Sequence, residues 1–221
     1  MRQSSSNNDA ATPGESAATS FLHRWGWAVA LLGAAVATLG DLGQLWIVNA
    51  ARPVLQLAAP PRGLLVIATL AGTFGIPLYA LGYCVRAHRA RRAAPRLSAL
   101  VAWAGVALAI VGGTVHAATG FAIANNAGGI AGGLAPLEGI FSAGPIVIAL
   151  WGLATVTFLC ASIGELCLPQ PRALRICNPL VATLALSAAA AMMPMPWPDF
   201  IAPASLNIAH LVFFARLGVF E

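Results

Sequence analysis

The chain has 221 residues, of which 59% are hydrophobic and only 9% are charged. A soluble domain carries about 25% charged residues, so this composition excludes a protein covered by water alone and indicates that lipid covers much of its surface. The net charge of +5 results from twelve basic residues, all of them Arg, and seven acidic residues. Because these arginines follow the connections between apolar segments and form no single basic face, the charge indicates membrane orientation and argues against nucleic acid as a partner.

Six segments are long and apolar enough to cross a bilayer, which takes about 20 mainly apolar residues. They lie near residues 25–50, 63–85, 97–124, 144–166, 178–196 and 202–219. The sequence therefore predicts an all-α fold, a bundle of six transmembrane helices formed by residues 21–221. Residues 1–20 are polar and rich in Ser and Asn. They cannot bury enough apolar surface to fold, so we expect a disordered cytoplasmic tail.

The distribution of arginines predicts the orientation of these segments. Five arginines fall in the connection after the second segment, namely Arg86, Arg89, Arg91, Arg92 and Arg96. Cytoplasmic connections carry such an excess of positive charge. With that connection inside, ten of the twelve arginines are cytoplasmic and both termini are inside. We expect a multi-pass protein of the cell (inner, cytoplasmic) membrane, with the lipid bilayer as its main partner.

The four cysteines, Cys84, Cys160, Cys167 and Cys177, map to the predicted cytoplasmic half. A reducing compartment keeps such residues as thiols, so no structural disulfide is expected. Their spacing contains no CxxC pair, and we predict no metal site, with a four-cysteine site as the minor alternative.

Polar side chains in three of the segments are expected at a similar depth, in the outer half of the membrane. Asp41 and Gln44 lie three residues apart and therefore share one face of the first segment. His116 is the ionisable residue of the stretch IVGGTVHAATG, residues 110–120, and glycines on both sides of it leave space. Asn207 and His210 share a face of the last segment. We expect these residues to meet in an intramembrane pocket.

The chemistry of this pocket starts from its carboxyl group. A charged side chain at the bilayer centre costs about 2.5–3.5 kcal/mol, so Asp41 is expected to be neutral, paired with an imidazole, or open to a wet cavity. Asp41 and His116 are the candidate catalytic residues, sharing a proton within hydrogen-bond reach. The candidate ligand-binding residues are Gln44, Asn207, His210 and Glu138. The alternative is that these groups only hold helices together by hydrogen bonds.

Other features predict local structure. Pro77 should kink the second helix, and Asn178 followed by Pro179 is a typical helix start. The connection over residues 126–143 is rich in Gly and nearly uncharged. We expect it to pack against the outer face of the bundle, where Glu138 would close the site as a lid residue. Glu165 and Arg216 are expected near the inner interface as ion-pairing or orienting residues.

Three stretches carry a resemblance: LGDLGQLW (residues 39–46), NPL (178–180) and APASLNIAHLVFFA (202–215). With them, most of the chain outside the tail resembles a family of small six-helix bacterial and fungal membrane proteins. No activity is established for that family. The resemblance implies the six-helix membrane fold and adds no functional residue to those already named.

Several functions are compatible with the predicted pocket. The first is binding or transport of a lipid-like or small amphipathic molecule, with Asp41 and His116 as its polar anchors. The second is an acid–base enzyme, of isomerase or cyclase type, acting on an isoprenoid or sterol-like substrate. The third is haem ligation by His116 and His210, and the fourth is a purely structural role. A phosphate-binding loop, a nucleophile elbow and an HExxH motif are all missing, which disfavours ATP-driven transport and familiar hydrolase chemistry. No cofactor is specified by the sequence.

Overall fold

The computed structural model describes residues 17–50, 55–61, 63–126 and 145–219, and within these residues the regular structure is entirely helical. The helices are α1 (Ala17–Ala50), α2 (Leu64–Gly75), α3 (Tyr79–Ala90), α4 (Pro95–Asn126), α6 (Pro145–Cys167), α7 (Arg172–Ile176), α8 (Pro179–Ala191) and α9 (Trp197–Val219). A single 3₁₀ turn, η2 (Ile76–Leu78), joins α2 to α3. The predicted all-α fold is confirmed for this part of the chain.

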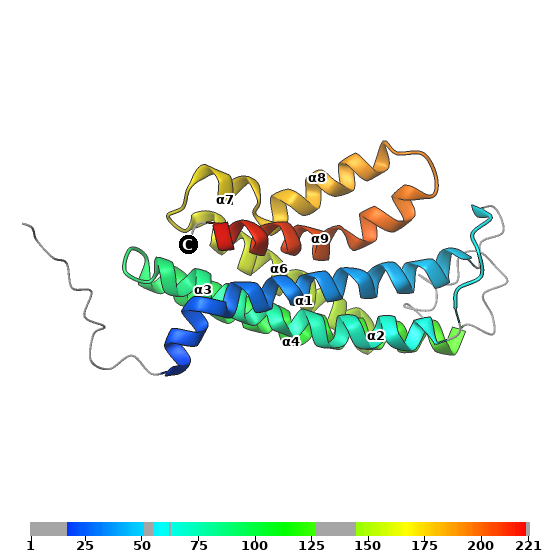
Figure 1. Cartoon of the computed structure of the whole chain (residues 1–221), viewed down its shortest axis with the longest axis horizontal. Helices are drawn as coiled ribbons and strands as arrows, with labels where there is room; N and C mark the ends of the chain where they lie inside the picture. The colour runs from blue at the N-terminus through cyan, green and yellow to red at the C-terminus, as the bar shows by residue number, and fades with distance from the viewer. Residues whose placement is uncertain (1–16, 51–54, 62, 127–144, 220–221) are drawn as a thin grey trace, which may run out of the picture.

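The long helices run side by side along one axis (Figure 1). Helix α1 packs against α2 and α3 on one side and against α9 on the other. Helix α4 covers the other side of α2 and α3 and in turn packs against α6, while α8 packs mainly against α9. This arrangement brings α1, α3, α4 and α9 close enough to share one buried interior.

Five helical stretches are long and apolar enough to cross a membrane: 24–50, 64–90, 95–124, 148–167 and 197–219. The remaining predicted span, 178–196, forms α8, whose 13 residues extend only about 20 Å, against a hydrocarbon thickness of about 30 Å. Large apolar side chains point outward, such as Trp103 (75% exposed) and Phe121 (68% exposed). Five apolar helices with such surfaces indicate a multi-pass membrane protein, and the sixth crossing stays a prediction.

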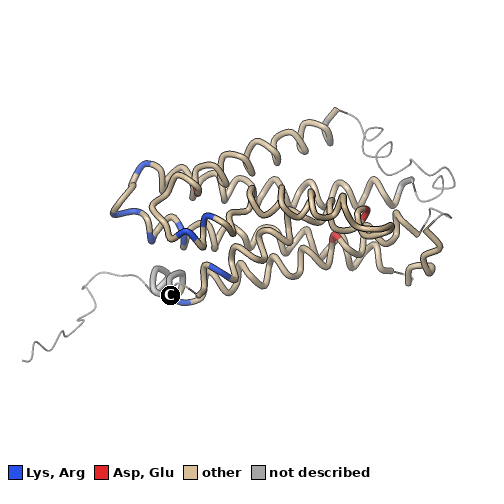
Figure 2. The backbone as a smooth tube through the Cα atoms, turned by 90° about the horizontal axis from the view of Figure 1, so that it is seen from above, with Lys and Arg blue, Asp and Glu red and all other residues tan. Residues whose placement is uncertain are grey.

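The described arginines gather at one end of the bundle, which is also where α9 ends (Figure 2). We call this the Arg-rich end and the other the opposite end. Helix α1 runs away from the Arg-rich end, so its first residue and the end of α9 lie on the same side, as the sequence predicted. The assignment of that side to the cytoplasm stays a prediction.

Three predictions concern segments at the edges of the described structure. Helix α1 begins at Ala17, so the last four residues of the predicted tail, 17–20, belong to a helix. The reason is that Ala and Ser tolerate a helix whose apolar part follows directly. The rest of the tail, and nearly all of the Gly-rich connection with its candidate Glu138, lie outside the described residues.

Proline and asparagine produce the predicted local structure. Pro77 lies in the 3₁₀ turn η2, where the missing backbone N–H interrupts the α-helical ladder between α2 and α3. The Asn178 side chain accepts a hydrogen bond from the backbone N–H of Leu180 at 3.0 Å, with Pro179 in the first turn of α8. The predicted helix start at Asn178 is confirmed, and at Pro77 the structure shows a 3₁₀ turn between two α-helices.

Small residues allow α1 and α2 to approach closely. A Cβ atom added at Gly40 would lie 2.7 Å from the carbonyl oxygen of Ala68 and 2.8 Å from the amide nitrogen of Gly72. Ala34 and Ala37, on the same side of α1, are fully buried. Close backbone contact of this kind is typical of helix interfaces in membranes, and here it places Asp41 and Gln44 beside α2 and α4.

Candidate functional site

The centre of the candidate site is the contact between Asp41 on α1 and His116 on α4. The Asp41 Oδ1 atom lies 3.2 Å from His116 Nδ1. Both residues lie within about 15 Å of the ends of their helices, near the opposite end of the bundle. The Asp41 side chain is 18% exposed and that of His116 only 5%. The hydrogen-bond reach that the sequence predicted for this pair is therefore present.

The second carboxyl oxygen of Asp41 connects the pair to α9 and α3. The Asn207 side-chain amide donates to Asp41 Oδ2 at 2.6 Å. The amide oxygen of Asn207 in turn accepts a hydrogen bond from the Tyr79 hydroxyl at 2.7 Å. Each Asp41 oxygen thus has a partner within the bundle, which compensates for burying a carboxyl group.

The far side of the imidazole determines where its protons lie. His116 Nε2 is 3.1 Å from the carbonyl oxygen of Ala68, which can only accept, so Nε2 carries a hydrogen in this contact. The Gln44 amide is also 3.1 Å from Nε2 and 3.2 Å from the Thr69 hydroxyl. If the Gln44 amide is turned end for end, its carbonyl oxygen accepts hydrogen bonds from His116 Nε2 and from the Thr69 hydroxyl. The positions of the heavy atoms do not distinguish the two orientations of the amide.

When Nε2 donates to Ala68, the contact between Asp41 Oδ1 and His116 Nδ1 is a hydrogen bond only if one proton lies between these two atoms. With Nε2 protonated, the pair is either a carboxylate with an imidazolium or a carboxylic acid with a neutral imidazole, and both forms have zero net charge. A pair without net charge is far less costly to bury than an isolated ion. The geometry therefore suits a group that moves a proton within the pair or exchanges it with a ligand.

Glycines shape the space around His116 differently from the expectation. The glycine that faces the imidazole is Gly72 of α2, where an added Cβ would overlap the ring. Gly113 of α4, expected to leave space beside His116, instead lies against Pro77 and the carbonyl oxygen of Thr73. The room for the imidazole thus comes from the neighbouring helix, a relation that spacing along α4 cannot reveal.

His210 belongs to a second polar group next to the site. Its Nε2 is 2.9 Å from the Tyr83 hydroxyl and its Nδ1 is 2.8 Å from the backbone oxygen of Leu206. The ring is fully buried and stacks on Tyr79, with 4.6 Å between centroids. In the described structure it therefore borders the Asp41–His116 pair through Tyr79 and has both ring nitrogens occupied.

Tyr79 and Tyr83 are the residues that the sequence analysis missed. They are four apart, so they share one face of α3, and both are fully buried. Two tyrosines at this spacing inside an apolar segment were a usable signal, because a buried hydroxyl needs a hydrogen-bond partner.

A third polar group lies toward the Arg-rich end. Arg86 Nε donates to Glu165 Oε1 at 3.0 Å, and the Asn178 side chain donates to Glu165 Oε2 at 2.7 Å. Arg86 is 4% exposed and Glu165 fully buried. The assignment of Arg86 to the loop was wrong, because α3 continues to Ala90 and its buried face reaches α6. The ion pairing expected for Glu165 is confirmed, with Arg86 as its partner.

Comparisons of the chain with protein-family models, with curated protein sequences and with solved structures found no match. The resemblance to small six-helix membrane proteins therefore stays a prediction. Function has to be inferred from the side chains of the site themselves.

Proposed function

We propose that the chain is an integral membrane protein that binds or transports a small amphipathic or lipid-like molecule at the Asp41–His116 pair. The observation that carries this proposal is that the carboxyl group of Asp41 contacts His116 and accepts a hydrogen bond from Asn207, while the Asp41 side chain is still 18% exposed. A carboxyl group that only joined helices by hydrogen bonds would gain nothing from a partly exposed side chain. A pocket that recognises a ligand combines an apolar wall with a few well-placed polar groups of this kind.

The proton shared by the pair gives the ligand a means of affecting the site. A ligand hydroxyl or amine that donates to Asp41 favours the carboxylate and moves the proton to His116. A ligand that only accepts favours the neutral acid. The Asp41–His116 contact is therefore the expected point at which ligand binding and proton position are linked.

The test is the retention of a ligand by purified protein. Mass spectrometry of molecules that co-purify in mild detergent should find an amphipathic compound with the wild-type chain and much less of it with Asp41→Asn. The matched control is Asp199→Asn, the same change in the first turn of α9, two turns from Asn207. If the wild-type protein and a folded Asp41→Asn variant retain equal amounts of the compound, the proposal is contradicted.

An acid–base enzyme is the second candidate, favoured by the same 3.2 Å contact between Asp41 and His116. A proton held between carboxyl and imidazole is suited to an isomerase or cyclase acting on an isoprenoid or sterol-like substrate. The two candidates differ in one result: an enzyme releases a chemically changed product, whereas a binding or transport protein returns the ligand unchanged.

Haem ligation is less well supported by the geometry. Both ring nitrogens of His116 and of His210 already have hydrogen-bond partners within the bundle. Binding iron would require each histidine to give up one of these contacts. An absorption spectrum of the purified protein with a Soret band would reverse this ranking.

A further inference from the structure

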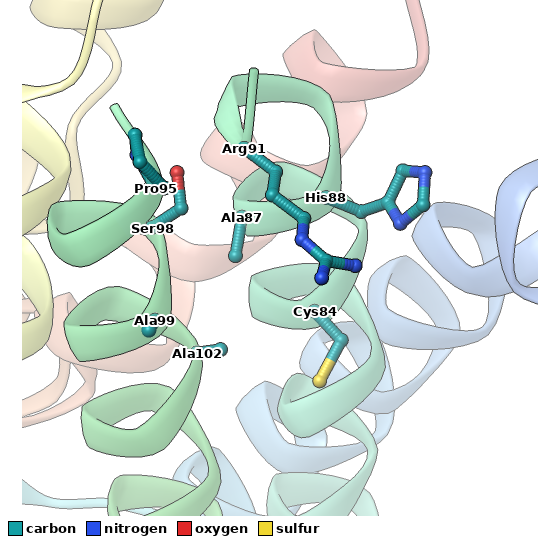
Figure 3. Close-up of a pocket in the computed structure, with 8 residues that line it drawn as sticks. All are labelled: Cys84, Ala87, His88, Arg91, Pro95, Ser98, Ala99 and Ala102. Atoms are coloured by element: carbon teal, nitrogen blue, oxygen red, sulfur yellow. The ribbon is translucent and has the colours of Figure 1, made fainter. Parts of the chain in front are cut away.

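A pocket lies at the Arg-rich end, between α3 and α4, and its lining shares no residue with the Asp41–His116 site. Its volume is about 300 Å³. It is lined by Cys84, Ala87, His88 and Arg91 from the α3 side and by Pro95, Ser98, Ala99 and Ala102 from α4 (Figure 3). Its walls combine small apolar side chains with basic ones.

The serine in this pocket lacks a hydrogen-bond partner. Ser98 is 2% exposed, and its Oγ atom makes no hydrogen bond in the described structure. A buried hydroxyl without a partner costs about 1–3 kcal/mol. A ligand that accepts a hydrogen bond at this place would remove that cost.

The charge around the pocket favours an anion. The Arg91 side chain folds back along α3 toward the level of Cys84 (Figure 3). Ser98 lies three residues into α4, about 5 Å from its first residue, where the partial positive charge of a helix N-terminus also attracts anions. A guanidinium and an unsatisfied hydroxyl thus line one pocket at the N-terminal end of α4.

We propose that this pocket binds the phosphate group of an anionic phospholipid, with Arg91 and Ser98 as its partners. The shared chemistry is that of a phosphate, and the apolar wall points to the lipid as its source. Ala99 is exposed on the surface of the bundle, and Trp103, one turn further along α4, is 75% exposed. Acyl chains hanging from a bound head group would run along this surface. Basic pockets between transmembrane helices are known to hold anionic head groups in this way.

The test uses the full chain in mild detergent, with phosphatidylglycerol, phosphatidylcholine or inorganic phosphate added. Lipid binding is followed by native mass spectrometry and by the shift in thermal unfolding. Phosphatidylglycerol should bind and stabilise the protein, and the other two additives should not. Arg91→Gln and Ser98→Ala should each weaken phosphatidylglycerol binding about tenfold, the loss expected for one charge-assisted hydrogen bond.

Matched controls separate this pocket from a general surface charge effect. Arg96→Gln removes the same charge from the first turn of α4 without lining the pocket. Ser162→Ala removes another buried hydroxyl, on α6, that does not line the pocket. Both controls should change binding less than threefold, whereas Ala99→Phe, at an exposed position, should fill the pocket and abolish binding.

Two outcomes would overturn the proposal. Equal loss of phosphatidylglycerol binding in Arg91→Gln and Arg96→Gln would show a diffuse charge effect. Binding of inorganic phosphate with the same dependence on Arg91 and Ser98, without preference for phosphatidylglycerol over phosphatidylcholine, would show a soluble phosphate site. Neither result depends on the Asp41–His116 proposal, so the two can fail separately.

Discussion

Two replacements of Asp41 distinguish the contribution of its hydrogen bonds from that of its acidic proton. In Asp41→Ala, His116 Nδ1 and the Asn207 amide both lose the partner that they have in the wild type. Both residues are buried, at 6% and 3% exposure. A buried polar group left without a partner costs about 1–3 kcal/mol, so the two together predict a loss of about 2–6 kcal/mol in the free energy of unfolding.

Asp41→Asn keeps the same contacts without the acidic proton. The new amide oxygen can accept from Asn207, and the new amide N–H can donate to His116 Nδ1. This needs His116 in the tautomer that donates from Nε2 to the carbonyl oxygen of Ala68, which the 3.1 Å contact already supports. The expected loss is therefore below about 1 kcal/mol, while ligand retention falls as proposed above. His116→Ala should also lose ligand, and it leaves a space in the bundle.

Unfolding of the purified variants in mixed detergent micelles, followed by circular dichroism, measures both losses. The result that matters is the difference in free energy of unfolding between Asp41→Ala and Asp41→Asn, because both remove the carboxyl group and only the first removes the hydrogen bonds. If the two variants differ by less than about 0.5 kcal/mol, the hydrogen bonds of Asp41 do not determine stability and the reasoning is refuted. If both variants bind the ligand as well as the wild type does, Asp41 has a purely structural role.

Further expectations follow from the packing around the site and from the orientation of the bundle. Gly72→Ala should lose about 1–3 kcal/mol in the same unfolding assay, because the added methyl overlaps His116; Gly152→Ala, where an added Cβ meets nothing within 4 Å, should change stability little. Arg86→Met should lose about 3–5 kcal/mol, because it leaves the buried Glu165 carboxylate without its cation, and a second change, Glu165→Gln, should recover part of that loss. In a variant without native cysteines, an impermeant thiol reagent added to intact cells should label a cysteine in the connection after α1 and not one in the Arg-rich connection; the reverse pattern would show that the orientation is wrong.

Much of the candidate site could be predicted from single residues within apolar segments. Asp41, His116 and Asn207 stand out because an ionisable or amide group in a lipid-covered segment needs a buried partner. Their positions along their helices give a similar depth. Together with the small side chains on one face of α1, this depth predicts the contact between Asp41 and His116, whose facing atoms lie 3.2 Å apart in the structure. Their chemical role stays a prediction.

Other parts of the site depend on which helix faces which. The tyrosines of α3 belong to the polar interior because α3 lies between α1 and α4 and reaches α9. Likewise, Arg86 is indistinguishable in the sequence from the loop arginines that follow it, and only the α3–α6 contact with Glu165 makes it a buried ion-pair residue.

What the sequence by itself determined is the class of protein: the low charge, the apolar segments and the clustered arginines require helices in lipid, because an unpaired backbone cannot cross a bilayer. It also determined the break at Pro77 and the cap at Asn178, because both act through their own backbone neighbours. Only the tertiary structure decided that Gly72 makes room for His116 and that Ser98 faces a pocket beside Arg91. These features depend on how the packed helices are rotated and spaced. Contacts between residues far apart in the chain determine that rotation and spacing.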